Sequence, residues 1–149
     1  MVGGAEVQQS ILARLLARAG YRVSMICLDY GQPAKVILEG VTVYRAYAPT
    51  AGLPGLRAIH PRITAMWRMM QEVDADIYYQ RTTAMLTAVM AAFCRRHGKY
   101  SIYAGASDSD FLPGREFIRY AHDRWLLRKG LAWVDRLVGQ NQRPQQDCL

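Results

Sequence analysis

The sequence predicts an α/β fold in which a parallel sheet carries helices on both faces. Short apolar runs rich in β-branched residues alternate with segments of helical periodicity, and turns rich in Gly, Asp or Pro separate them. Apolar residues make up 51% of the 149 residues, which is enough to bury the core of one compact domain. We therefore expect residues 1–149 to form a single domain built from βαβ units.

The composition limits the classes of partner and the cellular locations that are consistent with the sequence. The net charge of +7 suits phosphorylated ligands, anionic membrane surfaces or nucleic acid. Cys27, Cys94 and Cys148 are far apart and lack the spacing of a zinc site or a disulfide framework, so we expect no metal and a reducing cytoplasm. No stretch approaches the roughly 18 to 20 apolar residues that cross a bilayer, and the N-terminus lacks a signal-peptide pattern. We therefore expect a soluble or peripheral protein.

Two glycines, Gly3 and Gly4, open the first expected helix over residues 7–19. One side of this helix is apolar and consists of Val7, Ile11, Leu12, Leu15 and Leu16. Glycines allow a tight turn, and a helix N-terminus offers unpaired N–H groups with a partial positive charge, so a phosphate near Gly4 would be favoured. Glycines that only relieve crowding where a loop enters a packed helix would give the same pattern, and both interpretations stay open.

The segments after this helix predict strands. Residues 21–28 are apolar and β-branched, as in a strand buried on both faces. Residues 35–39 and 41–47 predict two further strands that reverse direction at Gly40. Residues 49–61 contain three prolines and two glycines and predict a long surface loop, which serves either binding or simple connection.

A helix, a strand and a second helix follow. Residues 62–73 predict a methionine-rich helix, whose apolar side chains suit core packing or a soft binding face. Residues 77–80 predict a strand that ends at Arg81. Thr82 or Thr83 caps the next helix, whose expected inward residues are Met85, Leu86, Val89, Met90 and Phe93. Its predicted end has Arg95, Arg96 and His97 followed by Gly98, so His97 is expected to be a terminal cap and not a ligand.

The last third of the chain again alternates predicted strands with predicted helices. Residues 100–104 predict a buried strand, and the loop at 105–110 follows it at the sheet edge where ligands of open α/β proteins bind. Residues 115–132 predict a long helix that mixes aromatic and basic side chains, which suits either packing on the sheet or contact with an anionic membrane. Residues 134–140 predict the last strand, and Pro144 fits the first turn of another helix.

Five stretches carry a family resemblance along nearly the whole chain. They are Gly-Gly-Ala-Glu at 3–6 with the helix that ends at 18–23, Gly-Val-Thr-Val-Tyr-Arg at 40–45, Ala-Asp-Ile-Tyr-Tyr-Gln-Arg at 75–81, Ser-Asp-Ser-Asp at 107–110, and Val-Asp-Arg-Leu-Val-Gly-Gln-Asn at 134–141 with Gln145 beyond. In this order they resemble the N-terminal domain of family 4 glycosyltransferases of the GT-B fold. The resemblance implies a hexosyltransferase-like enzyme that transfers a sugar from a nucleotide-sugar donor to a glycan or lipid-linked acceptor, between two Rossmann-like domains. This chain would be the acceptor-side domain, with the nucleotide-sugar as substrate and no separate cofactor.

The resemblance also implies roles for individual residues. Gly3 and Gly4 would lie near the donor diphosphate, in agreement with the helix-terminus argument. Arg81 would meet a phosphate or an acceptor hydroxyl, although an ordinary surface ion pair would explain it equally well. Glu6 and Ser107 join Arg81 as expected acceptor-binding residues.

Two aspartates are the expected catalytic residues. Asp108 and Asp110 would bind sugar hydroxyls or serve as a base, although turn formation alone also explains aspartates in a loop. Many members of the family carry a histidine at a strand end, but none of the three histidines is expected at such a position. Neither aspartate is therefore singled out as the base.

The sequence departs from the family pattern at both ends. The strand expected before Gly3 and the donor-binding second domain are not present in these residues, so we expect a fragment that is inactive alone. The alternative from another class is a non-catalytic basic α/β module that docks on an anionic membrane or a protein through residues 115–129. A nicotinamide-binding domain is disfavoured because GxGxxG is not matched, and nucleic acid is not expected as a partner because only the charge supports it.

Overall fold

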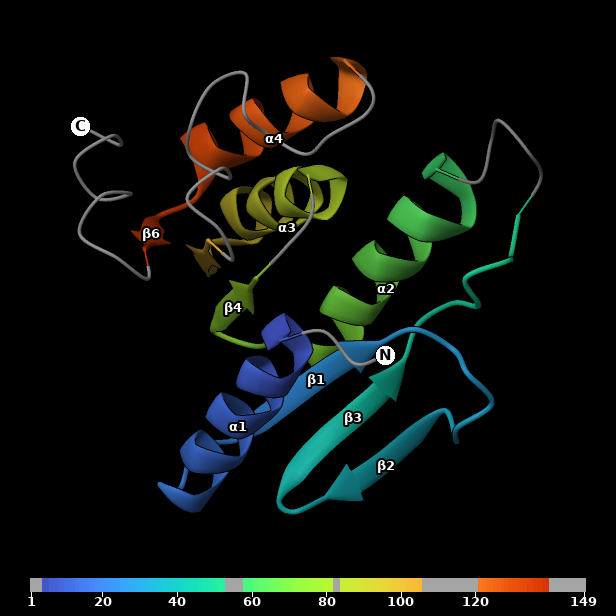
Figure 1. Ribbon diagram of the computed structural model, residues 1–149, viewed down its shortest axis with the longest axis vertical. Coiled ribbons are helices and arrows are strands. Elements are labelled where there is room, and N and C mark those ends of the chain that lie inside the picture. The colour runs from blue at the N-terminus through green and yellow to red at the C-terminus, as the bar shows by residue number, and fades with distance from the viewer. Residues whose placement is uncertain (1–3, 53–57, 82–83, 106–120, 140–149) are drawn as a thin grey trace. The chain divides into compact units, whose positions relative to one another are not determined.

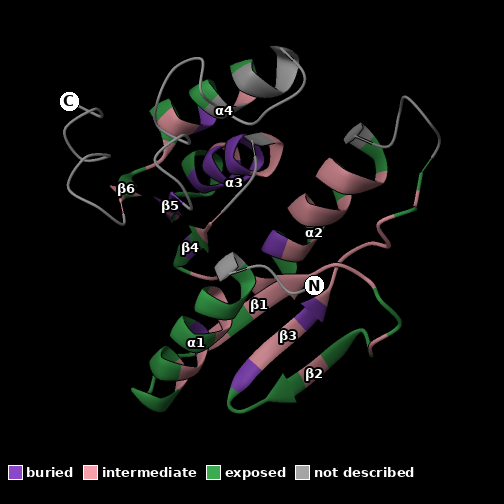
Figure 2. Ribbon diagram, viewed as in Figure 1, coloured by how far each residue is buried: buried purple, intermediate pink, exposed green. Residues whose placement is uncertain are grey.

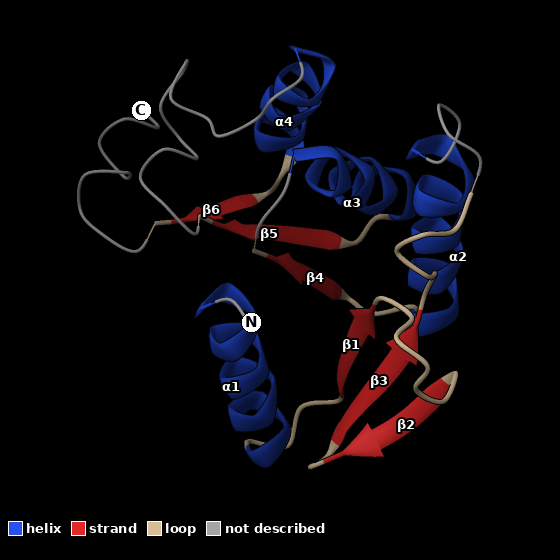
Figure 3. Cartoon of the chain, turned by 45° about the vertical axis from the view of Figure 1, so that its right-hand side comes forward, coloured by secondary structure: helices blue, strands red, loops and turns tan. Residues whose placement is uncertain are grey.

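The computed structural model describes residues 4–52, 58–81, 84–105 and 121–139 (Figure 1). The chain divides into two compact units, Met1–Ala75 and Asp76–Leu149, which are described separately. Each unit combines helices with a three-stranded sheet that contains parallel strands (Figure 3). The predicted α/β class is therefore confirmed, while the expectation of one single domain stays a prediction.

The first unit has a mixed sheet in the order β1-β3-β2. Its first four elements are α1 (Gly4–Arg18), β1 (Val23–Cys27), β2 (Lys35–Leu38) and β3 (Val41–Arg45). Strand β1 is parallel to β3, whereas β2 and β3 form an antiparallel hairpin. The hairpin turns at Glu39 and Gly40, which have φ angles of 49° and 83°. The predicted reversal at Gly40 is confirmed, because glycine adopts such angles without strain.

Helix α1 turns its apolar stripe away from the strands it contacts. It contacts β1 and β3, and on that side Ala13 is buried with 6% exposure. The five apolar side chains predicted on one side of the helix are exposed by 36–56%, and Figure 2 shows α1 largely as exposed. The predicted amphipathic pattern is therefore present, but small residues, Ala13 and Ala17, lie on the side that faces the sheet.

An irregular turn, η1 (Ala58–Ile63), and helix α2 (Thr64–Val73) complete the first unit. Helix α2 ends at Asp74, which has a left-handed φ of 43° and donates its backbone N–H to the Met70 carbonyl at 3.0 Å. Met70 is only 3% exposed. This burial supports the core interpretation of the methionine-rich helix.

The second unit has a fully parallel sheet in the order β4-β5-β6. Its elements are β4 (Ile77–Gln80), α3 (Ala84–His97), β5 (Tyr100–Ala104), α4 (Ala121–Trp133) and β6 (Arg136–Val138). Residues 115–120 of the predicted long helix, and the helix predicted at Pro144, lie outside the described residues. The strand predicted at 77–80 and that predicted at 100–104 have the bounds of β4 and β5.

Helix α3 is the core of the second unit. Of its expected inward residues, Val89, Met90 and Phe93 are buried, while Met85 and Leu86 are half-buried. The sequence missed a second buried side, which consists of Thr87, Ala88, Ala91 and Cys94. The cause is that α3 contacts β4 and β5 and also packs extensively along α4.

The close packing of α3 against α4 depends on small residues. Gly130 in α4 lies so close to α3 that an added Cβ would be 2.8 Å from the Ala88 backbone nitrogen. At the other end of α3, the His97 ring stacks on Phe93 with 4.3 Å between ring centroids, and Gly98 follows with a φ of 64°. The predicted glycine stop is thereby confirmed, and the contact seen for His97 is ring packing.

Strands β5 and β6 are joined at their amino ends by one side-chain pair. Asp135 Oδ2 accepts hydrogen bonds from Ser101 Oγ at 2.6 Å and from the Ser101 backbone N–H at 2.8 Å. Ser101 is fully buried. These bonds hold the pKa of Asp135 below its usual value, with the Ser101 hydroxyl as the main cause, because they stabilise the charged carboxylate.

Candidate functional site

In the first unit, two strands present their carboxyl ends along one edge. Strands β1 and β3 are parallel, with Cys27 opposite Arg45 at their ends. Beyond the strands, the backbone pairing continues from the Asp29 N–H to the Tyr47 carbonyl at 2.9 Å. The segments that leave β1 and β3 are therefore neighbours. This is the edge of an α/β sheet at which ligands bind.

A compact polar network occupies this edge. Asp29 Oδ1 accepts from the Gly31 N–H at 2.9 Å, and Gln32 Oε1 accepts from the Tyr30 N–H at 2.7 Å. The Gln32 amide also donates to the carbonyl of Leu28. We call Asp29, Tyr30, Gln32, Arg45 and Tyr47 the edge cluster.

Arg45 ties the two segments of the edge cluster together. Its Nη1 donates to the Gln32 carbonyl at 3.0 Å and lies 3.7 Å from Asp29 Oδ1. The side chains of Arg45 and Asp29 are 36% and 30% exposed. An ion pair this open to water contributes little stability, so its main effect is to fix the geometry of the loop.

Tyr47 follows β3 at this edge and contributes its backbone carbonyl. Burial raises its pKa, and the positive charge of Arg62 opposes that shift. A phenol with a raised pKa keeps its proton at neutral pH. The Tyr47 side chain is therefore neutral under physiological conditions.

In the second unit, the carboxyl ends of three parallel strands meet at a second edge. Arg81 follows β4, Gly105 follows β5 and Gly139 follows β6. The Gly105 N–H donates to the Val138 carbonyl at 3.0 Å, and the Arg81 Nε atom is buried. The predicted position of Arg81 at the end of its strand is confirmed, whereas its acceptor-binding role stays a prediction.

The other predicted site residues are only partly described. Gly4 is the first residue of α1, and Glu6 lies exposed in its first turn. Gly3, and the three loop residues Ser107, Asp108 and Asp110, lie outside the described residues. Gly4 and Glu6 belong to the first unit and Arg81 to the second, so neither unit alone brings all three together.

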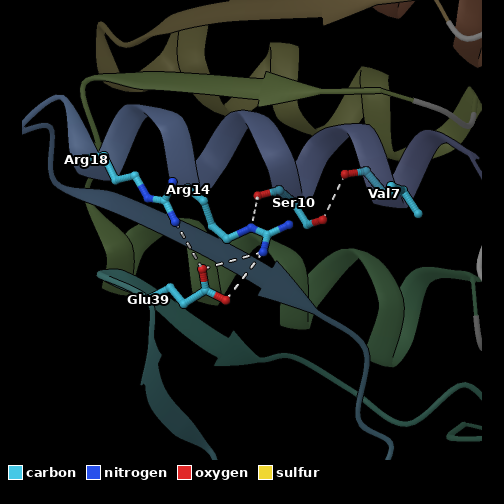
Figure 4. Close-up of polar contacts among 5 residues, drawn as sticks. All are labelled: Val7, Ser10, Arg14, Arg18 and Glu39. Carbon is cyan, nitrogen blue, oxygen red and sulfur yellow. Dashed lines mark hydrogen bonds and ion pairs between the residues drawn. The ribbon is translucent and has the colours of Figure 1, made fainter.

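A shallow hollow lies beside the second half of α1. It has a volume of about 230 Å³ and is lined by Ile11, Arg14, Leu15 and Arg18. Figure 4 shows the two arginines of α1 directed at one carboxylate, that of Glu39, at 3.4 Å from Arg14 and 3.8 Å from Arg18. Both guanidinium groups are thus engaged by Glu39, and the hollow is distant along the helix from Gly4. It is therefore not the predicted phosphate site.

Within the described ranges, no cluster of three or more His, Cys, Asp or Glu side chains could hold a metal ion. None of the helices in those ranges is both long and apolar enough to cross a bilayer. The edge cluster itself was missed by sequence reasoning, which ended a strand at residue 28 and assigned no role to residues 29–31. The Asp-x-Gly spacing was the available signal, because aspartate often accepts the N–H two residues later in a turn.

Comparison with known proteins identifies the family. The sequence profile of Glycosyltransferase Family 4 matches residues 2–143. A search of curated proteins finds no match to the chain. Because the profile covers nearly all of the sequence, it supports the predicted resemblance along its whole length. The chain therefore belongs to glycosyltransferase family 4.

Proposed function

We propose that the protein takes part in transferring a sugar from a nucleotide-sugar donor to a glycan or lipid-linked acceptor. The observation that carries this proposal is the family 4 match over residues 2–143. Polar and basic side chains at the carboxyl ends of parallel strands in both units support it, because open α/β folds bind ligands at such edges. The 149 residues would supply the acceptor side and would be inactive alone, with the nucleotide-sugar as the substrate in the cytoplasm.

Three groups of residues have proposed roles in this reaction. Gly3 and Gly4 would lie near the donor diphosphate, supported by the start of α1 at Gly4. Arg81 would bind a phosphate or an acceptor hydroxyl together with Glu6 and Ser107, supported by its place at the end of β4. The catalytic candidates are Asp108 and Asp110, because a carboxylate can bind sugar hydroxyls or accept a proton.

Binding and transfer assays test this proposal. Calorimetry with a panel of nucleoside diphosphate sugars measures donor affinity, and radiolabel transfer to glycan and lipid-linked acceptors measures turnover. Arg81→Gln should weaken binding of an anionic ligand about ten-fold or more, since a charge-assisted hydrogen bond contributes about 1.5–3 kcal/mol. Arg68→Gln, on the exposed side of α2, is the matched control and should leave affinity unchanged.

Two results would contradict parts of the proposal. If Arg81→Gln and Arg68→Gln bind equally well while both melt like the parent, Arg81 has no binding role. Sustained transfer by the 149-residue chain would contradict its inactivity alone. If none of the nucleotide-sugars binds or reacts, even when a donor-binding domain is added, the transferase proposal itself fails.

A second candidate function is docking on an anionic membrane, and a specific surface favours it. Trp125 and Trp133 of α4 are 59% and 37% exposed. The Lys129 ammonium lies 5.9 Å from the Trp125 ring centroid, and the Arg95 guanidinium lies 5.8 Å from that of Trp133. Tryptophans beside basic side chains suit the interface of an anionic bilayer. The protein would then work at the cytoplasmic surface of a membrane.

Vesicle sedimentation tests this second candidate. The protein should pellet with vesicles that contain acidic phospholipid and stay in solution with neutral vesicles or at high salt. Trp125→Ala should release it, whereas Tyr21→Ala, which removes a 66% exposed tyrosine from the first unit, should not. Equal pelleting with neutral and acidic vesicles, or no pelleting with either, would contradict the candidate.

A further inference from the structure

One member of the edge cluster, Tyr30, has an aromatic side chain that is exposed to water. Tyr30 is 78% exposed, the largest exposed fraction among the large apolar and aromatic side chains of the described residues. It belongs to the short segment that leaves β1 at the carboxyl edge of the first sheet. A ring this exposed contributes almost nothing to core packing, so packing does not account for its place on the surface.

The backbone beneath the ring is fixed by hydrogen bonds on both sides. The Tyr30 N–H donates to Gln32 Oε1 at 2.7 Å, and the next N–H, that of Gly31, donates to Asp29 Oδ1 at 2.9 Å. Arg45 anchors the far side by donating to the Gln32 carbonyl at 3.0 Å. The loop that carries the ring is thus ordered before a ligand binds. Binding therefore costs little conformational entropy of the loop backbone.

The chemistry around the ring suits a sugar. One face of a pyranose is made of C–H groups and packs against an aromatic ring, while its hydroxyls need hydrogen-bond partners around the edge. The Asp29 carboxylate and the Arg45 guanidinium both remain partly open to solvent, at 30% and 36% exposure. The residue next to Tyr30 in the chain thus offers a carboxylate acceptor, and the Arg45 guanidinium lies 3.7 Å from that carboxylate.

We propose that Tyr30 is a stacking platform for a sugar ring of the acceptor, with Asp29 as a hydroxyl-binding partner. Arg45 is a positioning residue, because it holds the loop that carries the ring. The proposal rests on the proposed function for its ligand class, since a glycosyltransferase acceptor is a saccharide or carries one.

Saturation-transfer NMR tests the platform directly. The probes are methyl α-D-mannopyranoside and methyl β-D-glucopyranoside at millimolar concentration. The wild-type chain should transfer saturation to ring C–H protons of at least one probe, and Tyr30→Ala should lower that transfer about five-fold. Tyr30→Phe should retain it, because stacking needs the ring and not the hydroxyl. Tyr21→Ala removes a ring of similar exposure, 66% against 78%, and should also retain it.

Arg45→Ala separates positioning from direct contact. It should lower saturation transfer and also speed amide hydrogen exchange at Tyr30 and Gly31, because the loop loses its anchor. Reduced transfer with unchanged exchange would overturn the positioning role. Equal transfer by wild type and Tyr30→Ala, an equal loss in Tyr21→Ala, or no transfer to either probe would overturn the platform.

A second probe in the same tube distinguishes this proposal from the proposed function. UDP-glucose reports donor binding through its uridine protons. Saturation of the uridine without the pyranoside overturns the platform and leaves the transferase proposal standing. Saturation of the pyranoside through Tyr30, with no nucleotide-sugar bound or used even when a donor-binding domain is added, retains the platform and overturns the transferase proposal.

Discussion

The two units use the same kinds of element but bury them differently. In the first unit, α1 exposes Leu15 by 56% and Ile11 by 44%. In the second, α3 leaves Ala91 and Cys94 with no exposed surface and Phe93 with 2%. The reason is that α3 has the sheet against one side and α4 along another, whereas the main contacts of α1 are with β1 and β3. Apolar periodicity alone thus indicates a helix but not which side becomes buried.

A matched pair of side-chain substitutions, one in each unit, tests this difference in burial most directly. Phe93→Ala should lower the free energy of unfolding by about 3–5 kcal/mol, because a buried aromatic ring leaves a cavity. Phe93 also meets Tyr78 edge to face, with 5.4 Å between ring centroids. Leu15→Ala should cost less than about 1 kcal/mol, since that side chain is already largely in water. Urea denaturation measures both, and equal losses would contradict the difference in burial.

Small residues between α3 and α4 give the next largest effect. Gly130→Ala should destabilise the second unit by about 1–3 kcal/mol, because its Cβ would press on the Ala88 backbone at 2.8 Å and the helices must separate. Ala132→Val, on the exposed side of the same helix, is the control and should cost less than about 1 kcal/mol. Thermal melts of the two variants would refute the close packing if Gly130→Ala were as stable as the parent.

The Ser101 and Asp135 pair gives a smaller effect with a defined pH dependence. Ser101→Ala should cost about 1 kcal/mol at pH 7. The Asp135 carboxylate loses the hydrogen bond from the Ser101 hydroxyl, and the Asp135 backbone N–H loses the Ser101 Oγ atom as an acceptor. Asp135 has a lowered pKa, so its contribution is complete above the usual value of 3.8 and is lost as the pH falls through the lower folded value. The stability difference between the parent and Asp135→Asn should therefore shrink below about pH 4. A difference that stays constant down to pH 2, measured by urea denaturation, would contradict this assignment.

Thiol labelling compares the units without perturbing their stability. Burial, with smaller contributions from neighbouring charges, raises the pKa of Cys94 to about 11. At neutral pH its thiolate should be about a hundred-fold scarcer than that of a thiol at the ordinary value of 9.0. In a Cys148→Ser background, Ellman's reagent should label half-buried Cys27 first and Cys94 only upon unfolding. Equal rates for both thiols would show that the second unit opens as readily as the first.

Local patterns predicted much of the fold. The stops at Gly40 and Gly98 were predictable, because glycine takes the left-handed angles that the turns require. The strand bounds of β4 and β5 followed from short apolar runs between turns and helix signals. The burial of Thr87 and Ala88 was not predictable from periodicity, because a second helix that is distant in the sequence covers them.

The site was less predictable than the fold. The end of β4 placed Arg81 at a sheet edge, since strand ends can be read from local sequence. The edge cluster depends on Arg45 reaching the Gln32 carbonyl, 13 residues earlier in the chain. Such a bond is set by the pairing of β3 with both β1 and β2, and no local pattern specifies it. Aspartates 108 and 110 remain predictions from resemblance.

The order β1-β3-β2 also bears on how the first unit folds. The hairpin of β2 and β3 closes over a two-residue turn. Strand β1 pairs with β3 only after a longer loop closes, because β2 lies between these two strands in the sequence. Short loops close first, so the hairpin forms on its own and its free edge then receives β1. Substitutions in the Glu39-Gly40 turn should therefore slow refolding in stopped-flow experiments, and changes in β1 should mainly speed unfolding. The network that presents Tyr30, which needs both strands, is consequently among the last parts of this unit to form.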